Sequence, residues 1–351
     1  MTAADAMRIF VPATLSFLFG MFLTPFLTHF LYKHKFWKPK AGKVALDGTA
    51  ALEFNRLHER KEVGTPRAGG ILVWGSVLLT ALVLAGLAQI SPQAFSSWAF
   101  VSREQTWLPF VALIIGSLIG FIDDLWEVRG RGGLPLRIRL VAVAVVSLLC
   151  AWWFYDKLGV SAISFPFIPG PVELGILFIP FFMLVALSLY AGGVIDGLDG
   201  LSGGIYGSIF AAYAGIAFFQ HQFNIAAFCA AIVGGLLAFL WFNIPPARFY
   251  LSETGTMGLT LALTVVVFLT DLHGAGRGLV ALPVIALLLA ATVVSDLLQI
   301  FWKRVFHRKL LRVAPLHHHF EAIGWPAYKV TMRYWVVGVV CAIIGMGIAL
   351  L

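Results

Sequence analysis

Charged residues are scarce in this chain of 351 residues. Only 12% of the residues are Asp, Glu, Lys or Arg, whereas 60% are hydrophobic and the mean hydropathy is +0.90. A water-soluble domain of this length needs about a quarter of its residues charged to cover its surface. The shortage therefore excludes a soluble cytosolic or secreted enzyme and a disordered chain. It also argues against nucleic acid as a partner, because no compact basic module is present to bind it.

Cysteine is equally rare. Cys150, Cys229 and Cys341 each lie inside an apolar run and lack the spacing of metal ligands, so we expect three buried thiols. We also expect no cleavable signal peptide. The first apolar run, at about 7–32, is too long for a signal sequence, and no small-residue cleavage site follows it. We interpret this run as a first membrane span.

Long apolar runs fill most of the sequence. Unbroken stretches of about 20 residues are typical of transmembrane helices, whereas the strands of a β-barrel would alternate apolar and polar residues. The sequence predicts an all-α, polytopic integral membrane protein that forms one domain over residues 1–351. Its ten expected spans lie at about 7–32, 68–90, 106–122, 136–157, 174–195, 201–220, 224–243, 257–271, 278–302 and 331–351.

The distribution of Lys and Arg predicts the orientation of these spans. Segments rich in Lys and Arg remain on the cytoplasmic side of a bacterial membrane. Both termini are then extracytoplasmic, because ten spans return the chain to its starting side. The positive face could simply reflect topology, or it could also attract phosphates and anionic lipid headgroups. Of the 25 Lys and Arg residues, 21 lie in the segments 33–67, 123–139, 244–256 and 303–333.

Two adjacent acids, Asp123 and Asp124, end the third expected span. A carboxylate at membrane depth costs several kcal/mol unless it is paired or hydrated. Adjacent carboxylates also repel each other, so one of them could act as a base. The alternative is an ordinary polar helix end at the interface, with Arg129 and Arg131 as counter-ions.

A second acidic group is the DGLDGL stretch at residues 196–201, which follows Gly192 and Gly193. On a helical turn, Asp196 and Asp199 would share one face because they are three residues apart. The stretch could also be a simple hairpin, since Asp-Gly is a common turn signal. Two acids among so many glycines favour a ligand site over a plain turn.

A third polar group, at residues 243–256, follows the seventh expected span. Glu253 is its one acid, and Tyr250 lies three residues earlier, where its ring could stack on a nucleobase. Residues 252–256 could instead cap the next helix.

A fourth group is the PLHHHFE stretch at residues 315–321. Adjacent side chains diverge, and structural zinc sites use spaced ligands, so zinc is a poor fit. Imidazoles that donate hydrogen bonds to an anionic ligand fit better. The alternative is a solvated loop.

A fifth group is the GTPRAGG stretch at residues 64–70. Its glycines beside Arg67 could hold a phosphate. A closely packed helix start would explain them equally well.

The five groups all fall on the predicted cytoplasmic face. Carboxylates with a basic surround suggest Mg²⁺ and a diphosphate substrate, because Mg²⁺ prefers oxygen ligands and commonly bridges carboxylates to phosphates. A site at the membrane implies that one substrate is a lipid. Together these features favour phosphoryl transfer between a soluble nucleotide derivative and a lipid phosphate.

The same motifs carry a family resemblance. The PLHHHFE stretch with the following GWP at 324–326 closely resembles the family of phospho-N-acetylmuramoyl-pentapeptide transferases. This family lies within the superfamily of polyprenyl-phosphate N-acetylhexosamine-1-phosphate transferases. The resemblance covers residues 60–335 approximately. Its other signatures occur here in order as GTP and GG within 64–70, the acidic pair, DGLDGL at 196–201, WFN at 241–243 and PA at 246–247.

The resemblance implies a multi-pass enzyme of the bacterial cytoplasmic (inner) membrane, with its active site on the cytoplasmic face. Such an enzyme transfers phospho-MurNAc-pentapeptide from UDP-MurNAc-pentapeptide to undecaprenyl phosphate. The products are lipid I and UMP, in peptidoglycan synthesis, and the cofactor is Mg²⁺. Families of this kind commonly dimerise, so a homodimer is a further expectation.

Roles for individual residues follow from the resemblance alone. It implies that Asp123, Asp124 and Asp196 are catalytic, with one acid of the pair as a base toward the lipid phosphate. It implies that Asp124, Asp196 and Glu253 bind the metal. The remaining positions match substrate-binding residues of the family. Those of the uridine pocket are Gly197, Leu198, Asp199, Asn243 and Tyr250. Those of the histidine motif are His317, His318 and His319.

Five positions depart from the family pattern. Glu253 stands where the family has Asp, and Mg²⁺ tolerates little misplacement of a ligand. Glu127 stands where a basic residue usually follows the acidic pair. Arg139 replaces a lysine, which keeps the charge but changes the geometry. Tyr190 and Gly193 replace two asparagines.

These departures keep alternatives open. One is a transferase for another UDP-N-acetylhexosamine, although the histidine motif argues against it. Another is a non-catalytic relative that acts as a scaffold or binds lipid. A transporter is a third, suggested only by Asp296 inside the ninth expected span.

Overall fold

The chain folds almost entirely into helices, as its apolar composition predicts. The computed structural model describes residues 2–39, 42, 63–101, 106–165, 168, 170–271 and 277–351, so most of the predicted cytoplasmic segment 33–67 lies outside it. The helices are α1 (Ala3–Lys33), α3 (Gly70–Ile90), α4 (Pro92–Phe95), α5 (Trp107–Val128), α6 (Leu136–Lys157), α7 (Phe178–Ala191), α8 (Leu201–Phe219), α9 (Phe223–Asn243), α10 (Ser252–Leu269), α11 (Gly278–Ile285), α12 (Leu287–Phe306), α13 (Leu316–Ala322) and α14 (Ala327–Leu350).

Within the described residues, nine helices are long and apolar enough to cross a membrane. The count rises to ten if α11 and α12, which meet at an angle of 60°, form one bent span. This confirms the prediction of an all-α protein with about ten spans. Several predicted limits agree closely, such as 136–157 for α6 and 224–243 for α9. The bend was not predicted.

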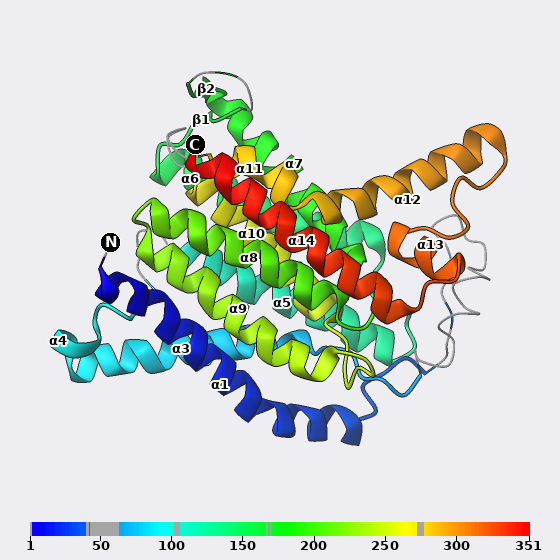
Figure 1. Cartoon of the computed structure of the whole chain (residues 1–351), viewed down its shortest axis with the longest axis horizontal. Coiled ribbons are helices and arrows are strands. Elements are labelled where there is room, and N and C mark those ends of the chain that lie inside the picture. The colour runs from blue at the N-terminus through cyan, green and yellow to red at the C-terminus, as the bar shows by residue number, and fades with distance from the viewer. Residues whose placement is uncertain are drawn as a thin grey trace.

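The helices form one bundle around α10 (Figure 1). Within the apolar window of α10, 94% of the residues are buried, compared with 22% for α1 at the edge. Helix α5 packs along α10 very closely. A Cβ atom added at Gly120 would overlap the carbonyl oxygen of Glu253, and one at Gly116 would lie 2.9 Å from the Cα of Gly258. Small residues therefore let these two helix backbones touch.

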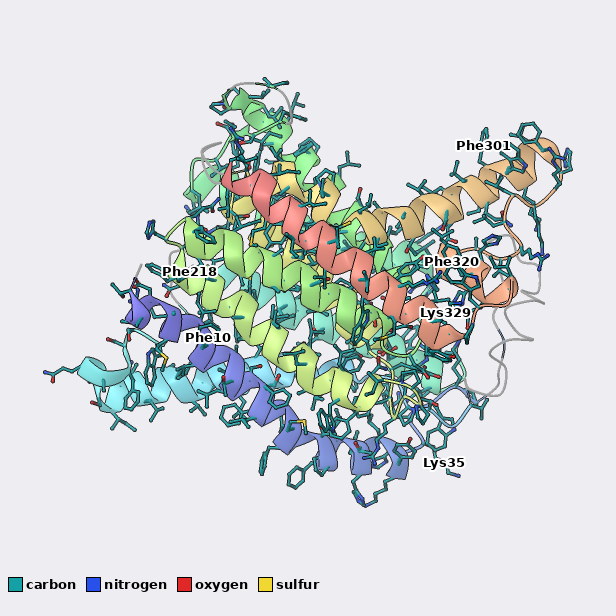
Figure 2. All side chains as sticks on the ribbon, in the orientation of Figure 1. Phe10, Lys35, Phe218, Phe301, Phe320 and Lys329 are labelled. Carbon is teal, nitrogen blue, oxygen red and sulfur yellow. The ribbon has the colours of Figure 1, made fainter. Side chains whose placement is uncertain are left out.

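The outer surface of the bundle is apolar, as a bilayer requires. Phe10, Phe22 and Phe26 on α1 are each more than 60% exposed, and α1, which carries Phe10, lies at the edge of the bundle (Figure 2). Helix α12, which carries the exposed Phe301, projects outward beyond the bundle. Exposed apolar faces of this extent suit contact with lipid chains rather than with water.

One end of the bundle contains a short hairpin and a buried acid. Strands β1 (Ala162–Ile163) and β2 (Val172–Glu173) pair in an antiparallel manner. Asp271, which is 2% exposed, accepts hydrogen bonds from the backbone N–H groups of Ser164 (2.9 Å) and Leu279 (3.4 Å). Burial raises the pKa of Asp271 to about 7, although both hydrogen bonds oppose the shift. Asp271 thus connects the end of α10 to the hairpin and to α11.

The opposite end of the bundle contains the polar motifs. Helix α14 ends beside the hairpin and α1 begins at the same end of the bundle, whereas α13 and the C-terminal part of α5 lie at the other end (Figure 1). Two 3₁₀ helices flank α7, Gly175–Leu177 and Gly192–Ile195, and the second of these leads into the DGLDGL turn.

Candidate active site

Helix α5 presents its acidic pair from inside the helix rather than from its end. The predicted span stopped at residue 122, but α5 continues to Val128. Asp123 and Asp124 are therefore held rigidly and are buried, with exposures of 3% and 0%. The prediction that the helix ends at these acids was wrong, because both carboxylates have partners inside the protein and the helix continues past them.

Asp123 faces the loop between α5 and α6. Its Oδ1 accepts a hydrogen bond from the N–H of Leu134 at 2.6 Å and lies 3.8 Å from Nε of Arg139. Gly133 has a φ of +77°, and a Cβ atom there would lie 3.1 Å from the same oxygen. Glycine therefore allows this loop to close over the carboxylate.

Asp124 faces the first turn of α10. Its Oδ2 accepts hydrogen bonds from Oγ of Ser252 (2.6 Å), from the N–H of Thr254 (3.0 Å) and from Oγ1 of Thr254 (2.5 Å). Its Oδ1 lies 3.5 Å from Nη1 of Arg67. Three donors and a guanidinium stabilise the charged form of this buried acid.

The cations beside the pair are not the neighbours that the sequence suggested. Arg67 lies beside Asp124 and Arg139 beside Asp123, whereas the side chains of Arg129 and Arg131 are exposed. Both expected counter-ions follow the end of α5 and have exposed side chains, and the guanidinium of Arg131 lies over the ring of Trp126, so the expectation of local pairing was wrong.

Ser252 joins two of the predicted acidic groups. Its N–H donates to Oδ2 of Asp196 at 2.7 Å, while its hydroxyl donates to Asp124. Its Oγ also accepts from the N–H of Ala68. Helix α10 has no side-chain cap, so the expectation that residues 252–256 cap this helix was wrong. Ser252 instead links the two acids, because its hydroxyl donates to Asp124 and its N–H donates to Asp196.

The DGLDGL stretch forms a turn and not a helix. The Oδ1 of Asp196 accepts from Oγ of Ser202 at 2.6 Å, whereas Oδ2 of Asp199 accepts from the N–H of Ala247 at 3.4 Å. The two carboxylates therefore have separate partners, and the expectation of a shared helical face was wrong. Leu198 between them is buried.

Asn243 holds this turn against the loop that follows α9. Its Oδ1 accepts from the N–H of Gly200 at 2.9 Å, and its Nδ2 donates to the carbonyl of Phe249 at 2.8 Å. Gly200 has a φ of +78°, which glycine adopts without strain, and its carbonyl accepts from Nε1 of Trp335. Asn243 thus fixes two backbone segments at the site.

Tyr250 connects the GTPRAGG stretch to the same region. Its N–H donates to the carbonyl of Pro66 at 2.9 Å, and its carbonyl accepts from the N–H of Gly69 at 2.8 Å. A Cβ atom at Gly69 would lie 2.6 Å from that carbonyl oxygen. Close backbone packing therefore explains this glycine, and the packing places Arg67 at the acids.

The histidine motif divides between two environments. His317 and His318 are buried, their ring centroids are 4.3 Å apart, and both lie against Gly197. A Cβ atom at Gly197 would lie 2.5 Å from Nε2 of His317 and 2.7 Å from Nε2 of His318. His319 is half-buried and turns away, where its Nδ1 accepts from the N–H of Arg312. Two of the three predicted histidines therefore contact the DGLDGL turn.

Glu321 orients one of these rings. Its Oε2 lies 2.8 Å from Nδ1 of His318. With Glu321 ionised, the proton of His318 lies on Nδ1 and is donated to the carboxylate, so Nε2 faces Gly197. The sequence pointed to Glu321 only as part of the motif.

Three of the departures from the family pattern lie together. Nη1 of Arg139 lies 2.5 Å from Oε1 of Glu253, and the side chain of Tyr190 lies near the same guanidinium. The two charged side chains are 24% and 25% exposed, so the pair is reachable from solvent. The side chain of Glu253, one methylene longer than an aspartate, reaches the guanidinium of Arg139.

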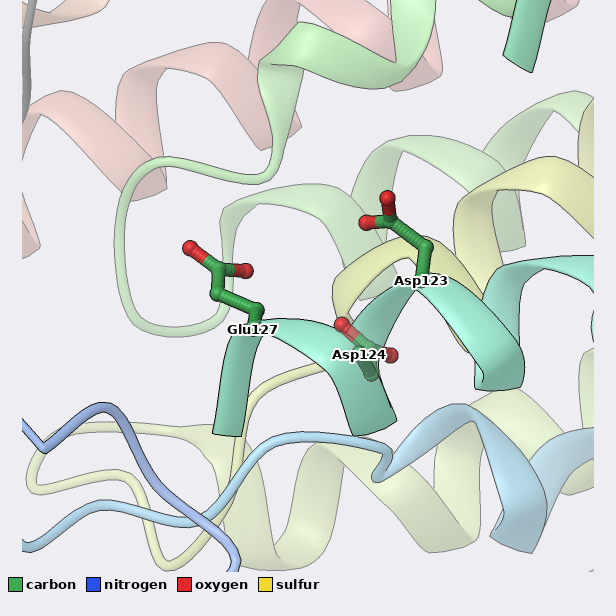
Figure 3. A group of neighbouring side chains, drawn as sticks. All are labelled: Asp123, Asp124 and Glu127. Atoms are coloured by element: carbon green, nitrogen blue, oxygen red, sulfur yellow. The ribbon is translucent and has the colours of Figure 1, made fainter. Parts of the chain in front are cut away.

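Three carboxylates of α5 are close enough to hold a metal ion. The ligand atoms of Asp123, Asp124 and Glu127 lie within 4.8 Å of one another (Figure 3). Of the metal set implied by resemblance, Asp124 belongs to this group, whereas Asp196 and Glu253 have the partners described above. Carboxylate oxygens are the ligands that Mg²⁺ prefers. The three- and four-residue spacing of Glu127 from the pair was the sequence signal for this group.

Comparison with known proteins agrees with this architecture. The sequence model of the glycosyl transferase family 4 matches residues 106–271, which include α5, the DGLDGL turn and α10. The fold and the acidic site thus define an integral membrane glycosyl transferase.

Relatives define the family more narrowly. A phospho-N-acetylmuramoyl-pentapeptide-transferase of Geobacillus sp. (strain WCH70) is 32% identical over 95% of this chain and 95% of its own length. The same enzyme from Listeria monocytogenes (strain EGD-e) is 32% identical over 94% of this chain and 95% of its own, and that of Anoxybacillus flavithermus is 29% identical over 96% and 97%. The chain belongs to the phospho-N-acetylmuramoyl-pentapeptide-transferase family, which confirms the resemblance.

Proposed function

We propose that this protein transfers phospho-MurNAc-pentapeptide from UDP-MurNAc-pentapeptide to undecaprenyl phosphate, forming lipid I and UMP for peptidoglycan synthesis. The observation that carries the proposal is the contact of Ser252 with both Asp124 and Asp196. This contact unites acids that lie more than 70 residues apart, in a chain whose relatives are named for this reaction. The site faces the cytoplasm of a bacterial inner membrane, where the nucleotide substrate is available.

The reaction joins an oxygen of the lipid phosphate to the phosphorus attached to the sugar. The bond from that phosphorus to the bridging oxygen breaks, and UMP leaves with the electron pair. Asp124 already accepts three hydrogen bonds, which favour its charged form. We therefore assign to Asp124 the role of binding a cation. Asp123 is then the acid that accepts a proton from the lipid phosphate.

The donor set of α5 fits a magnesium ion. Asp124 would hold it together with Asp123 and Glu127, whose ligand atoms lie closest. The set of Asp124, Asp196 and Glu253, which the resemblance implies, is the alternative. A bound Mg²⁺ would neutralise charge on the phosphate oxygens.

The remaining predicted residues form the substrate pocket in this proposal. Gly197, Leu198, Asp199, Asn243 and Tyr250 contribute to the uridine pocket. The packing of His317 and His318 on Gly197 supports this grouping, because it brings two imidazole rings beside the turn. The third histidine, His319, would act from the edge of the site.

The proposal is tested by product formation. Purified protein with Mg²⁺, undecaprenyl phosphate and UDP-MurNAc-pentapeptide should release UMP and form lipid I. Asp124→Asn should lower the rate at least about 100-fold, because the reaction loses a buried charge at its centre. Asp156→Asn is the matched control, since Asp156 is exposed and pairs only with the exposed Lys157 among the contacts described.

Three outcomes would contradict the proposal. No UMP release by folded protein with any divalent metal would favour a non-catalytic relative. Release only with UDP-GlcNAc would favour a transferase of another sugar. An unchanged rate in Asp124→Asn would remove this acid from the mechanism.

A further inference from the structure

Two cations in the first turns of α14, which begins beside α13 (Figure 1), lie over one aromatic ring. Nζ of Lys329 lies 5.3 Å and Cζ of Arg333 lies 4.2 Å from the centre of the Trp325 ring. Trp325 in turn stacks on Phe320, with ring centroids 4.9 Å apart and an angle of 22° between the planes. Both cations reach the same ring because they are four residues apart on one helix. The rings therefore hold two positive groups close together beside the histidine motif.

No ion pair joins either cation to an acid in the part of the chain that the structure describes. The sequence contains no Asp or Glu after Glu321, whose carboxylate lies beside His318. Lys329 and Arg333 are both exposed. A guanidinium that stacks on an aromatic ring keeps its N–H groups for a further partner. The two side chains therefore offer two positive charges and several hydrogen-bond donors to an anion.

The two cations face away from the DGLDGL turn. Thr331 and Trp335 of α14 face that turn, because Oγ1 of Thr331 donates to the carbonyl of Asp199 at 3.2 Å and Nε1 of Trp335 donates to that of Gly200 at 3.0 Å. Each cation is two residues from Thr331, and two residues turn an α-helix by about 200°. The thickness of α14 thus separates the cations from the turn, so they lie outside the substrate pocket proposed above.

The outer face of α14 also carries an exposed apolar stripe, which we call the α14 stripe. Tyr328, Met332 and Val336 are each more than half exposed, and the stripe continues through Val340 and Ile343. Residues three or four apart lie along one side of a helix. The α14 stripe begins beside the two cations and follows the helix away from the site end of the bundle (Figure 1). An anion that fits this face therefore carries an apolar chain.

We propose that Lys329 and Arg333 bind the phosphate of a monophosphate lipid whose chain lies along the α14 stripe, outside the reaction site. A guanidinium binds phosphate through paired hydrogen bonds, and an ammonium binds it as a point charge. A phosphate monoester carries about −1.5 to −2 charges at pH 7, which two cations match better than they match the single charge of a phosphodiester headgroup. The inference rests on the proposed function only for the identity of the lipid, undecaprenyl phosphate.

Photo-crosslinking tests this site without turnover. The probe is farnesyl phosphate with a photoreactive diazirine on its chain, added without nucleotide to the full-length protein in nanodiscs of phosphatidylcholine. We expect labelled peptides from residues 328–343. The double variant Lys329→Ala, Arg333→Ala should lower this labelling about tenfold, because the phosphate loses both cations. Arg333→Lys alone should retain part of it.

A cation outside the cluster provides the matched control. Arg129 is exposed and follows the end of α5, at the same end of the bundle. Arg129→Ala should be labelled as strongly as the unaltered protein, and unchanged melting temperatures show that each variant is folded. Excess undecaprenyl phosphate should abolish labelling, whereas excess phosphatidylglycerol should leave most of it. Equal loss with the two lipids would overturn the assignment to a monophosphate.

Two other results would overturn the inference. One is labelling of the α14 stripe that persists unchanged in the folded double variant, because the cations would then not hold the phosphate. The other is the absence of label on α14, which is expected if a second copy of the chain or zwitterionic lipid covers this face.

Kinetic measurements separate this inference from the proposed function. In the double variant the KM for undecaprenyl phosphate should rise at least about fivefold, with kcat and the KM for UDP-MurNAc-pentapeptide unchanged. Protein that is labelled on α14 through the two cations but releases no UMP would contradict the transferase function alone. Release of UMP by the double variant, with an unchanged KM for the lipid and unchanged labelling, would contradict the lipid site alone.

Discussion

At the residue scale, the departures from the family pattern form connected pairs. Arg139 pairs with Glu253 near Tyr190, and Glu127 pairs with Lys38 and Arg67. A longer acid or a reversed charge at one position is matched by a partner that reaches it. The charged side chains at these positions are therefore paired in the folded protein.

The pair of Arg139 and Glu253 should behave as one unit in a double-mutant cycle. We expect Arg139→Ala and Glu253→Gln each to lower kcat/KM, and the double variant to lose less than the sum. The coupling free energy should be about 1–2 kcal/mol, as for contacting charges that are partly shielded from water. The exposed pair of Asp156 and Lys157 is the control, with coupling below about 0.5 kcal/mol. Additive losses at Arg139 and Glu253 would contradict the pairing.

Asp271 should make stability depend on pH. Its pKa is about 7 in the folded protein against an ordinary value of 3.8, so between these values the folded state keeps a proton that the unfolded state has lost. Stability therefore falls as pH rises from 4 to 7, by up to about 4 kcal/mol. Melting temperatures in detergent should fall over this window, and Asp271→Asn should make the profile less steep. An equally steep profile in the variant would show that another group is responsible.

The sequence indicated the site residues better than their partners. The motifs pointed to Asp124, Asp196 and His318 because acids and histidines are unusual at the ends of apolar spans. The partners of Asp124 could not be predicted, because Ser252 and Thr254 are 128 and 130 residues away and only the folded chain brings them near. The outward turn of His319 likewise depends on Arg312 in the preceding loop.

At the element scale, the contact between α5 and α10 positions the acids. A methyl group at Gly120 would overlap the backbone of Glu253, in the first turn of α10. That turn carries the donors to Asp124. Any separation of the two helices therefore moves the hydroxyl groups away from the carboxylate.

Gly120→Ala should thus damage both stability and activity. We expect a loss of about 2 kcal/mol or more in stability, because overpacking forces backbone shifts, and at least a tenfold loss of turnover. Gly86→Ala on α3 is the matched control, since no atom lies within 4 Å of the added methyl group. Equal melting temperatures for the two variants would contradict the close packing.

Span boundaries were predictable where composition changes sharply and unpredictable where geometry decides. Apolar runs located α6 and α9 closely. The hydropathy of the run at 278–302 gave no sign of the 60° bend, because both helices are apolar and together form one hydrophobic segment. Pro283 was the available signal, although the break follows at Ala286.

At the scale of the whole molecule, the site lies at one end of the bundle, whereas α1 begins and α14 ends at the opposite end (Figure 1). The concentration of Lys and Arg near the site predicts that this end is cytoplasmic. Alkaline phosphatase fused after Leu351 should therefore be active in cells, since it folds only outside the cytoplasm. A fluorescent protein that matures only in the cytoplasm should stay dark there. The reverse result would contradict the predicted orientation.

The hydrogen bonds of Asp124 also bear on biosynthesis. The ribosome completes α5 before Ser252 and Thr254 exist, so the new helix enters the membrane with a carboxylate that still lacks its donors. Until α10 is inserted, the last turns of α5 must stay hydrated at the bilayer surface to avoid the cost of an unpaired charge in lipid. A nascent chain stalled before α10 is thus apolar enough to remain in the membrane but has no assembled site. Maturation of this protein therefore depends on the late arrival of its most buried helix.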